Sequence, residues 1–325
     1  MGTRLRIETP TDFVLARDVC SYGYFILQPN FWDVRRRTLT RPLELGEGPA
    51  TAVIAQPGGV GGELRVVFDR ALTRGEQREA RAQITRMLRL DEDAEHLRGF
   101  HAADPRWAES GRGRLFRSPT MFEDVIKTVT SCNVAWPSTV RMNQRLCAVF
   151  GRASGRGAPA AFPTVERLSR AKPGTLRARC GVGYRDQRIV ELAKLFKPRG
   201  RKPAEMDPAW FEDPATSDAD VRTALLTLPG IGPYAAANIM QLLGRYGHVP
   251  LDTESVRHGK TVLGMTGTDR EIMRAVADHF APFGEHVFRS YWFELWAFYE
   301  SKKGPAETWD RETTASAFTA ALLKG

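Results

Sequence analysis

The stretch Leu228-Pro229-Gly230-Ile231-Gly232-Pro233-Tyr234 lies between two apolar patterns of helical spacing, and Val249-Pro250-Leu251-Asp252 follows it. Two glycines one residue apart permit a turn so tight that its backbone N–H groups can touch a phosphate directly. Asp252 then comes at the head of the next segment, where a lone carboxylate can do chemistry beside an anchored phosphate. We therefore predict that this turn and this Asp form one functional unit.

The segments on both sides of the turn are predicted to be helices. Ser217–Asp220 matches the capping-box pattern [ST]-x-x-[DE] at a helix start. The apolar residues that follow recur on one helical face: Val221, Ala224, Leu225 and Leu228. Pro233 stands in the first turn of the second helix, where its missing N–H costs nothing, and Gly244 ends that pattern. An ordinary helical hairpin is the alternative, and Pro229, Pro233 and the following Asp argue against it.

The composition favours a nucleic-acid partner. The chain of 325 residues has 47 Lys and Arg against 38 Asp and Glu, a formal net charge of +9, with a pI of about 9.6. Such a charge favours binding to a polyanion through counterion release. No apolar run is long enough to span a membrane, and the first residues lack the pattern of a signal peptide. We expect a cytoplasmic, bacterial protein that acts at the nucleoid and has no membrane partner.

The four cysteines are widely spaced and form no CxxC pair, which is typical of reduced thiols in a cytoplasm; they are Cys20, Cys132, Cys147 and Cys180. The histidines form no HExxH motif or similar ligand set. The sequence therefore predicts no metal bound by side chains.

The chain changes character near residue 115. Before it, Gly23–Leu27, Thr51–Gln56 and Glu63–Phe68 have the alternating or β-branched patterns of strands, and the glycine-rich stretch Gly58–Gly62 joins the last two as a turn. Thr73–Leu90 has the pattern of a helix.

From Pro119 onward the patterns are helical, apart from the predicted loops Gly151–Ala161 and Lys197–Pro208. We predict an α+β protein: an N-terminal mixed α/β domain with an antiparallel sheet, residues 1–115, followed by an all-helical domain, residues 116–325.

The turn and Asp252 resemble the helix-hairpin-helix and Gly/Pro…Asp signature of the base-excision DNA glycosylases. Phe122–Phe150, which contains Asn133, resembles the opening helices of 8-oxoguanine glycosylases, and Gly181–Arg185 resembles their second glycine turn. Phe288–Trp292 is similar to a segment of the 3-methyladenine glycosylase II family that lies on a helix lining the base pocket. The N-terminal strands suit the extra domain that both families carry.

The resemblance implies a role for each matching residue. Asp252 would be the catalytic carboxylate, and Asn133 would enter the space that an extruded base leaves. Contacts to the DNA backbone would come from the glycine turns and the residue after the hairpin: Gly183, Gly230, Gly232 and Tyr234. A Na⁺ or K⁺ ion would bridge the hairpin carbonyls near Leu228 and Gly230 to phosphate. Some relatives carry an iron–sulfur cluster on cysteines after the catalytic Asp, but no cysteine follows Asp252, so no cofactor is expected.

The reaction type depends on Tyr234. In the bifunctional 8-oxoguanine enzymes a Lys at this position forms a Schiff base with the sugar, which Tyr cannot do, so water is the expected nucleophile. Tyr234 either offers an aromatic face to a flipped base or packs between helices, and Asn238 and Phe293 are the other candidates for the base pocket. Asp252 stabilises the cation-like sugar of the transition state, kept ionised by the helix dipole; its structural alternative is a helix N-cap.

The sequence thus predicts a monomeric, monofunctional DNA glycosylase that flips a damaged base, most simply an alkylated one, out of double-stranded DNA and hydrolyses its N-glycosidic bond. Two alternatives stay open: a bifunctional 8-oxoguanine-type glycosylase/lyase that uses a displaced Lys, and a non-catalytic helix-hairpin-helix DNA-binding protein. The basic segments Arg35–Arg37 and Lys194–Lys202 are either solvated loops or contacts to the phosphate backbone.

Overall fold

A five-stranded antiparallel sheet forms the base of the molecule in the computed structural model, which describes residues 2–198 and 204–310. The strand order is β1-β5-β4-β3-β2, and every neighbouring pair is antiparallel. The strands are β1 (Arg4–Ile7), β2 (Phe31–Asp33), β3 (Thr38–Leu45), β4 (Gly48–Ala55) and β5 (Leu64–Phe68). The predicted antiparallel sheet and the α+β class are therefore confirmed.

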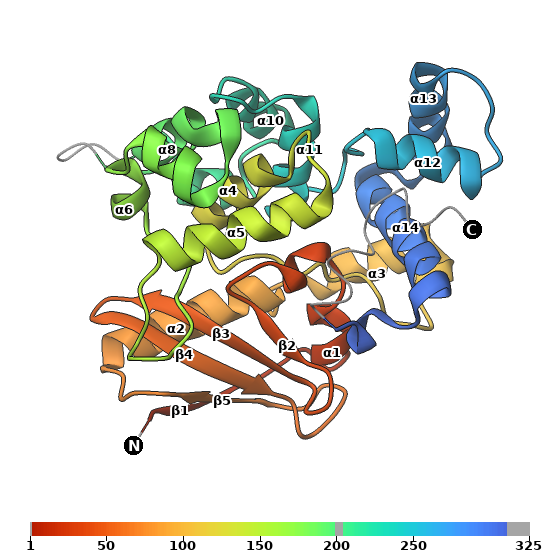
Figure 1. Cartoon of the computed structure of the whole chain (residues 1–325). Coiled ribbons are helices and arrows are strands. Elements are labelled where there is room, and N and C mark those ends of the chain that lie inside the picture. Colours follow the sequence, from red (N-terminus) through yellow and green to blue (C-terminus); the bar gives the residue numbers. More distant parts are fainter. Residues whose placement is uncertain (1, 199–203, 311–325) are drawn as a thin grey trace.

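One face of the sheet is apolar and is covered by a helix. Along β5, Leu64, Val66 and Phe68 are buried while Arg65 and Val67 are exposed, as the two-residue period of a strand requires. Helix α2 (Arg74–Leu88) contributes buried side chains to the same core and lies along the sheet (Figure 1). The hydrophobic effect thus decides which face of the sheet is covered.

Outside the sheet, the regular elements of the described chain are helices (Figure 1). Two short helical elements lie between β1 and β2, namely α1 (Leu15–Val19) and η1 (Gly23–Ile26), and α3 (Ala94–Ala103) follows α2. The second half contains α4 (Met121–Ser131), α5 (Trp136–Phe150), α6 (Val165–Ser169), α7 (Pro173–Thr175), α8 (Asp186–Leu195), α9 (Pro208–Glu212), α10 (Asp218–Leu226), α11 (Pro233–Leu242), α12 (Thr253–Thr261), α13 (Asp269–Phe280), η5 (Ala281–His286) and α14 (Val287–Lys303).

The segment predicted as a strand at Gly23–Leu27 is instead the 3₁₀ helix η1, so that prediction was wrong. All four residues of η1 are buried, whereas a half-buried strand would hide only every second side chain. The three-residue winding sends its side chains in several directions. One of them, the Tyr24 hydroxyl, lies 2.8 Å from the Thr128 hydroxyl of α4. Burial on all sides, rather than on one face, decides this local structure.

The buried apolar residues form two clusters that do not follow the chain in order. One cluster consists of residues between Met121 and Leu243. The other combines the sheet, α2 and α3 with residues of α12–α14 from the far end of the chain. The indole N–H groups of Trp292 and Trp296 on α14 donate to the carbonyls of Ser21 and Cys20 at 2.8 and 3.1 Å. The final helices therefore share a core with the N-terminal sheet, and the predicted boundary between 115 and 116 stays a prediction.

The predicted connections are present where the structure describes them. Gly58–Gly62 joins β4 to β5, and Gly151–Ala161 contains no helix or strand beyond one isolated bridge. Lys194 lies near the end of α8, while residues 199–203 of that basic segment lie outside the described residues. In the other basic segment, Arg36 and Arg37 form ion pairs with Asp33 and Glu307 at 2.9 and 2.8 Å. Among the described residues, no helix combines the length and the apolar character that a bilayer crossing requires.

Candidate active site

The Leu228–Gly232 turn connects α10 to α11 as a helical hairpin. Ser217 caps α10 by accepting from the N–H of Asp220 at 3.1 Å, and Pro233 is the first residue of α11. The N–H of Ile231 donates to the carbonyl of Leu228 at 3.1 Å, which closes the turn. The predicted helix-hairpin-helix is therefore confirmed.

The two glycines of the hairpin are there for different reasons. Gly230 has a φ of +77°, and an added Cβ would lie 2.5 Å from Cδ of Arg188, so the fold itself requires a glycine there. Gly232 has a φ of −96°, is exposed, and an added Cβ would meet no atom within 4 Å. It is also the N-cap of α11, which has no side-chain cap. The first N–H groups of α11 therefore donate no hydrogen bond to a capping side chain, and they lie at the positive end of the helix dipole.

Asp252 is the N-cap of α12. Its Oδ1 accepts from the N–H groups of Glu254 and Ser255 at 2.9 and 3.2 Å, and its own N–H donates to Oγ of Ser255 at 2.8 Å. The capping alternative is therefore a real structural role, and it uses only one of the two carboxylate oxygens.

The protonation of Asp252 differs from what the helix position alone predicts. Burial raises the pKa of its carboxyl from 3.8 to about 6, outweighing the hydrogen bonds from the backbone of Ser255 and Glu254 and from the Tyr234 side chain, which lower it. The helix start favours the ionised form of Asp252 through these backbone hydrogen bonds, but the loss of hydration disfavours the charged form more strongly. The carboxyl is still mostly ionised at neutral pH, yet close enough to neutral pH to exchange a proton.

Tyr234 and Asn238 lie one turn apart on α11 and connect the hairpin to Asp252. Asn238 donates from Nδ2 to the carbonyl of Tyr234 at 3.0 Å. Burial and the neighbouring carboxylate of Asp252 raise the pKa of Tyr234 well above its ordinary value, so this side chain is a neutral phenol beside a carboxylate. The structure thus brings together three residues that the sequence analysis selected.

A fourth residue of this cluster, Tyr22, comes from the N-terminal part and was missed by the sequence analysis. Its hydroxyl donates to Oδ1 of Asn238 at 3.2 Å, and its ring lies 4.6 Å from that of Trp292 on α14. Burial raises its pKa, and the charge of Asp252 raises it further. Tyr22 lies far from the hairpin in the sequence, so no local pattern could have indicated it.

Phe293 does not join this cluster. Its ring packs 6.0 Å from that of Phe100 and 5.8 Å from that of Trp107, and the residue is 1% exposed. The structure therefore places it in the core between α14 and the N-terminal part, contrary to the predicted base pocket. On the same helix, Trp292 is the residue that reaches Tyr22. One residue along a helix rotates the side chain by about 100°, which separates the two environments.

Two further turns lie close to the hairpin. Asn133 is exposed and has a φ of +51°, directly after α4, and Gly183 has a φ of +58° in the second glycine turn. Arg185 joins these turns, because its guanidinium donates to the carbonyls of Val129 and Asn133 at 3.1 and 3.4 Å. The position of Asn133 at an exposed turn suits the role that the resemblance implies for it.

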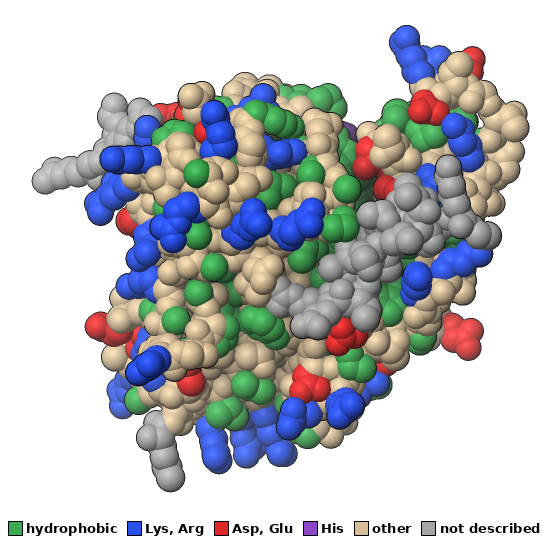
Figure 2. Space-filling model, viewed as in Figure 1, with side chains coloured by type: hydrophobic (Ala, Val, Ile, Leu, Met, Phe, Trp, Pro, Cys, Tyr) green, Lys and Arg blue, Asp and Glu red, His purple; other side chains and the backbone are tan. Residues whose placement is uncertain are grey.

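The surface between these turns is basic. The guanidinium of Arg188 lies 5.0 Å from the ring of Tyr184, which is 52% exposed, while Arg185, whose guanidinium lies 4.5 Å from the same ring, is buried. Arg188 also approaches Gly230 of the hairpin, and Arg141 and Arg145 are exposed on α5. In the view of Figure 2, Lys and Arg side chains form a band over the region of α5 and α8. Such a surface, with backbone N–H groups at the hairpin, suits the phosphates of a nucleic acid.

The fold is shared with known structures, although no protein-family model and no curated protein matches the chain. The 3-methyladenine DNA glycosylase from Archaeoglobus fulgidus is 17% identical, with a TM-score of 0.67 over 92% of this chain and 98% of that one. MBOgg1, in complex with a low-affinity DNA ligand, is 18% identical, with a TM-score of 0.61 over 92% of this chain and 97% of that one.

A third similar structure is the 8-oxoguanine glycosylase/lyase of Clostridium acetobutylicum in its apo form. It is 15% identical, with a TM-score of 0.56 over 84% of this chain and 92% of that one. The resemblance to 3-methyladenine and 8-oxoguanine DNA glycosylases is therefore confirmed at the level of the fold, over nearly the whole chain.

Proposed function

We propose that this protein is a monofunctional DNA glycosylase that removes an alkylated base from double-stranded DNA. The observation that carries the proposal is the environment of the Asp252 carboxylate. The start of α12 holds one of its oxygens. Apart from burial, the groups that shift its pKa most are Ser255, Glu254 and Tyr234, and none of them is a cation. A half-buried carboxylate without a cationic partner among the described residues is costly in a merely structural role. It suits a site where positive charge develops during a reaction.

The reaction follows from these groups. The backbone N–H groups at Gly232 and the start of α11 hold a phosphate, and Gly183 holds a second stretch of backbone. The hairpin carbonyls near Leu228 and Gly230 would hold a Na⁺ or K⁺ ion, which would supply positive charge beside that phosphate. The damaged base leaves the stack, and Asn133 fills the gap. Water forms a bond to C1′ as the C1′–N bond breaks, and Asp252 stabilises the positive sugar and takes the proton from water. A cationic alkylated base accepts the bonding electron pair and leaves neutral.

Tyr234 argues for water rather than an amine as the nucleophile. The phenol stands beside Asp252, where the resemblance would place the Schiff-base Lys of a glycosylase/lyase, and it cannot form an imine. Two more aromatic rings belong to this cluster: that of Tyr22, whose hydroxyl donates to Asn238, and that of Trp292, which lies 4.6 Å from the Tyr22 ring. Aromatic faces attract a cationic base through their quadrupole, which is why an alkylated base is the proposed substrate.

A panel of duplexes, each with one modified base, tests the proposal. We expect release of a methylated purine, strand breaks only after hot alkali, and no covalent adduct after borohydride. The same panel with Asp252→Asn is the control for a contaminating enzyme. Efficient borohydride trapping would instead assign a glycosylase/lyase. Tight binding of one lesion without release of any base would assign a DNA-binding protein that does not catalyse.

A further inference from the structure

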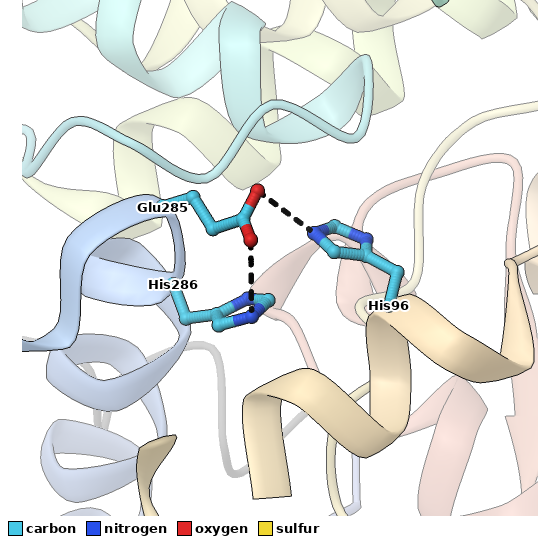
Figure 3. Close-up of side chains that lie close together, drawn as sticks. All are labelled: His96, Glu285 and His286. Carbon is cyan, nitrogen blue, oxygen red and sulfur yellow. Dashed lines mark ion pairs between the residues drawn. The ribbon is translucent and has the colours of Figure 1, made fainter. Parts of the chain in front are cut away.

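Three side chains with metal-binding atoms converge where α3 meets the junction of η5 and α14. His96 comes from α3, and Glu285 and His286 come from the end of η5. The carboxylate of Glu285 lies 4.0 Å from Nε2 of His96 and 3.8 Å from Nε2 of His286, and the three ligand atoms all lie within 4.8 Å of one another. Figure 3 shows the three side chains pointing toward one another.

Two glycines shape this arrangement. Gly284 has a φ of +56°, a conformation that favours glycine, and it turns the chain so that Glu285 and His286 approach α3. Gly99 lies on α3 itself, and an added Cβ there would lie 3.3 Å from Nε2 of His286. A glycine inside a helix costs roughly 0.5–1 kcal/mol relative to Ala. Here it leaves the space that the His286 ring occupies.

The imidazole of His96 is oriented by a second carboxylate. Its Nδ1 lies 3.3 Å from Glu92, which forms an ion pair with the buried Arg289. A proton on Nδ1 directs the lone pair of Nε2 toward Glu285 and His286. A carboxylate behind a histidine in this way is the usual outer partner of a metal-bound histidine.

The second imidazole is held differently. His286 is 4% exposed, and its ring packs against those of His96 and Phe100, with ring centroids 4.8 and 5.7 Å apart. Packing therefore fixes the position of this ring beside His96.

We propose that His96, Glu285 and His286 bind one Zn²⁺ ion, with the fourth coordination position open to water. Two imidazoles and one carboxylate are a common zinc ligand set, whereas Mg²⁺ and Ca²⁺ prefer oxygen ligands alone. Neighbouring ligands of a tetrahedral zinc lie roughly 3.3 Å apart, so the most distant of these ligand atoms, which lie within 4.8 Å of one another, must approach by up to about 1.5 Å. Glu285 is free to make that movement, because its side chain is 76% exposed.

The proposed ion fastens the start of α14 to α3, which joins the last long helix to the N-terminal part of the chain. It takes no part in the proposed reaction at Asp252. No metal bound by side chains was expected from the sequence, because His96 lies far from Glu285 and His286 along the chain and no local motif joins them.

Calorimetric titration of the untagged, full-length protein with ZnCl₂, after dialysis against a chelator, tests the proposal. We expect one ion per chain and affinity at least about tenfold weaker in His96→Gln and in Glu285→Gln. His279→Gln is the matched control, because this histidine is exposed on α13 outside the cluster, and its affinity should equal that of the unmodified protein. Co²⁺ should give the visible absorption of a four-coordinate ion, and excess Mg²⁺ should not displace zinc.

Thermal unfolding gives a second readout that separates binding from folding. Zn²⁺ should raise the Tm of the unmodified protein and of His279→Gln but leave Glu285→Gln unchanged, while all three unfold at similar temperatures without metal. The proposal is overturned if the unmodified protein binds no stoichiometric zinc. It is equally overturned if both His96→Gln and Glu285→Gln retain the original affinity.

Discussion

The starts of α2 and α12 have the same capping motif, yet the pKa values of their carboxyl groups shift in opposite directions. Both have a capping box, with Thr73 and Glu76 at α2 and with Asp252 and Ser255 at α12. At α2, hydrogen bonds from Arg70 lower the pKa of Glu76 to about 2. At α12, burial dominates and raises the pKa of Asp252 to about 6. The same local motif therefore contains one carboxylate whose charge is balanced by an arginine and one whose charge is not.

The difference lies in the partner rather than in the helix. The guanidinium of Arg70 forms an ion pair with Glu76 at 2.5 Å, so the positive charge that this carboxylate needs is part of the fold. Near Asp252 the Tyr234 side chain contributes a hydrogen bond but no charge. A carboxylate in that position gains most from a positive charge that arrives with the substrate, which is the proposed role of Asp252.

The largest expected effect is on the rate of base release, which should depend on Asp252 but not on Glu76. Asp252→Asn should lower the rate of base release at least about a hundredfold while lesion binding stays within a few-fold, given the size of single electrostatic contributions to catalysis. Glu76→Gln should leave the rate of base release unchanged. Single-turnover release from a lesion duplex measures both variants. Near-normal release by Asp252→Asn would show that the Asp252 carboxylate is not needed for catalysis.

The same two variants should change stability in opposite directions at pH 8. In the folded protein the pKa of the Asp252 carboxyl is about 6, above its ordinary value of 3.8. The protonated carboxyl therefore contributes fully to the free energy of unfolding below pH 3.8, and this contribution is lost as the pH rises through about 6. Asp252→Asn should therefore stabilise the fold by up to about 3 kcal/mol. The pKa of Glu76 is lowered instead, so its ionised carboxylate stabilises the fold above pH 4.5 and loses this effect as the pH falls toward about 2. Glu76→Gln should therefore destabilise the fold at pH 8. Urea unfolding at pH 8 measures both, and changes of equal sign would contradict the prediction.

The two hairpin glycines extend the comparison from side chains to the backbone. Gly232→Ala should weaken binding to damaged and undamaged duplexes alike, by about tenfold, because a hydrogen bond to a charged group contributes roughly 1.5–3 kcal/mol. Its Tm should not change, since the added Cβ meets no protein atom. Gly230→Ala should instead lower the Tm, because of its φ of +77° and of Arg188. Unchanged affinity of Gly232→Ala for DNA at physiological salt would show that the turn connects two helices and does not contact a phosphate.

The smallest effect tests how Tyr234 acts on Asp252. The rate of base release should fall tenfold per pH unit below about 6, as the carboxyl becomes protonated. Tyr234→Phe removes a hydrogen bond that lowers this pKa, so the acid limb should move to higher pH by less than about one unit. A profile of the single-turnover rate between pH 4.5 and 8 shows the shift. An acid limb that does not move would assign Tyr234 to packing alone.

Much of the site could be predicted from short stretches of sequence. The hairpin, the caps at Ser217 and Asp252 and the first residue Pro233 of α11 depend on residues a few positions apart, and the structure contains all of them. The positions of Tyr22 and Phe293 could not be predicted in this way. Both depend on how α14 packs against the N-terminal part, where adjacent residues of one helix face different surroundings.

By itself, the sequence determined the local elements: the tight glycine turn, the capped helix starts, and the strands β4 and β5. These follow from backbone conformation and from the periodicity of apolar residues, which act over a few positions. Only the tertiary structure decided that η1 is a helix, that the pKa of Asp252 is raised, and that His96 meets Glu285 and His286. The physical reason is that burial and charge–charge interactions sum over residues distant in the chain, and their balance exists only once the chain has folded.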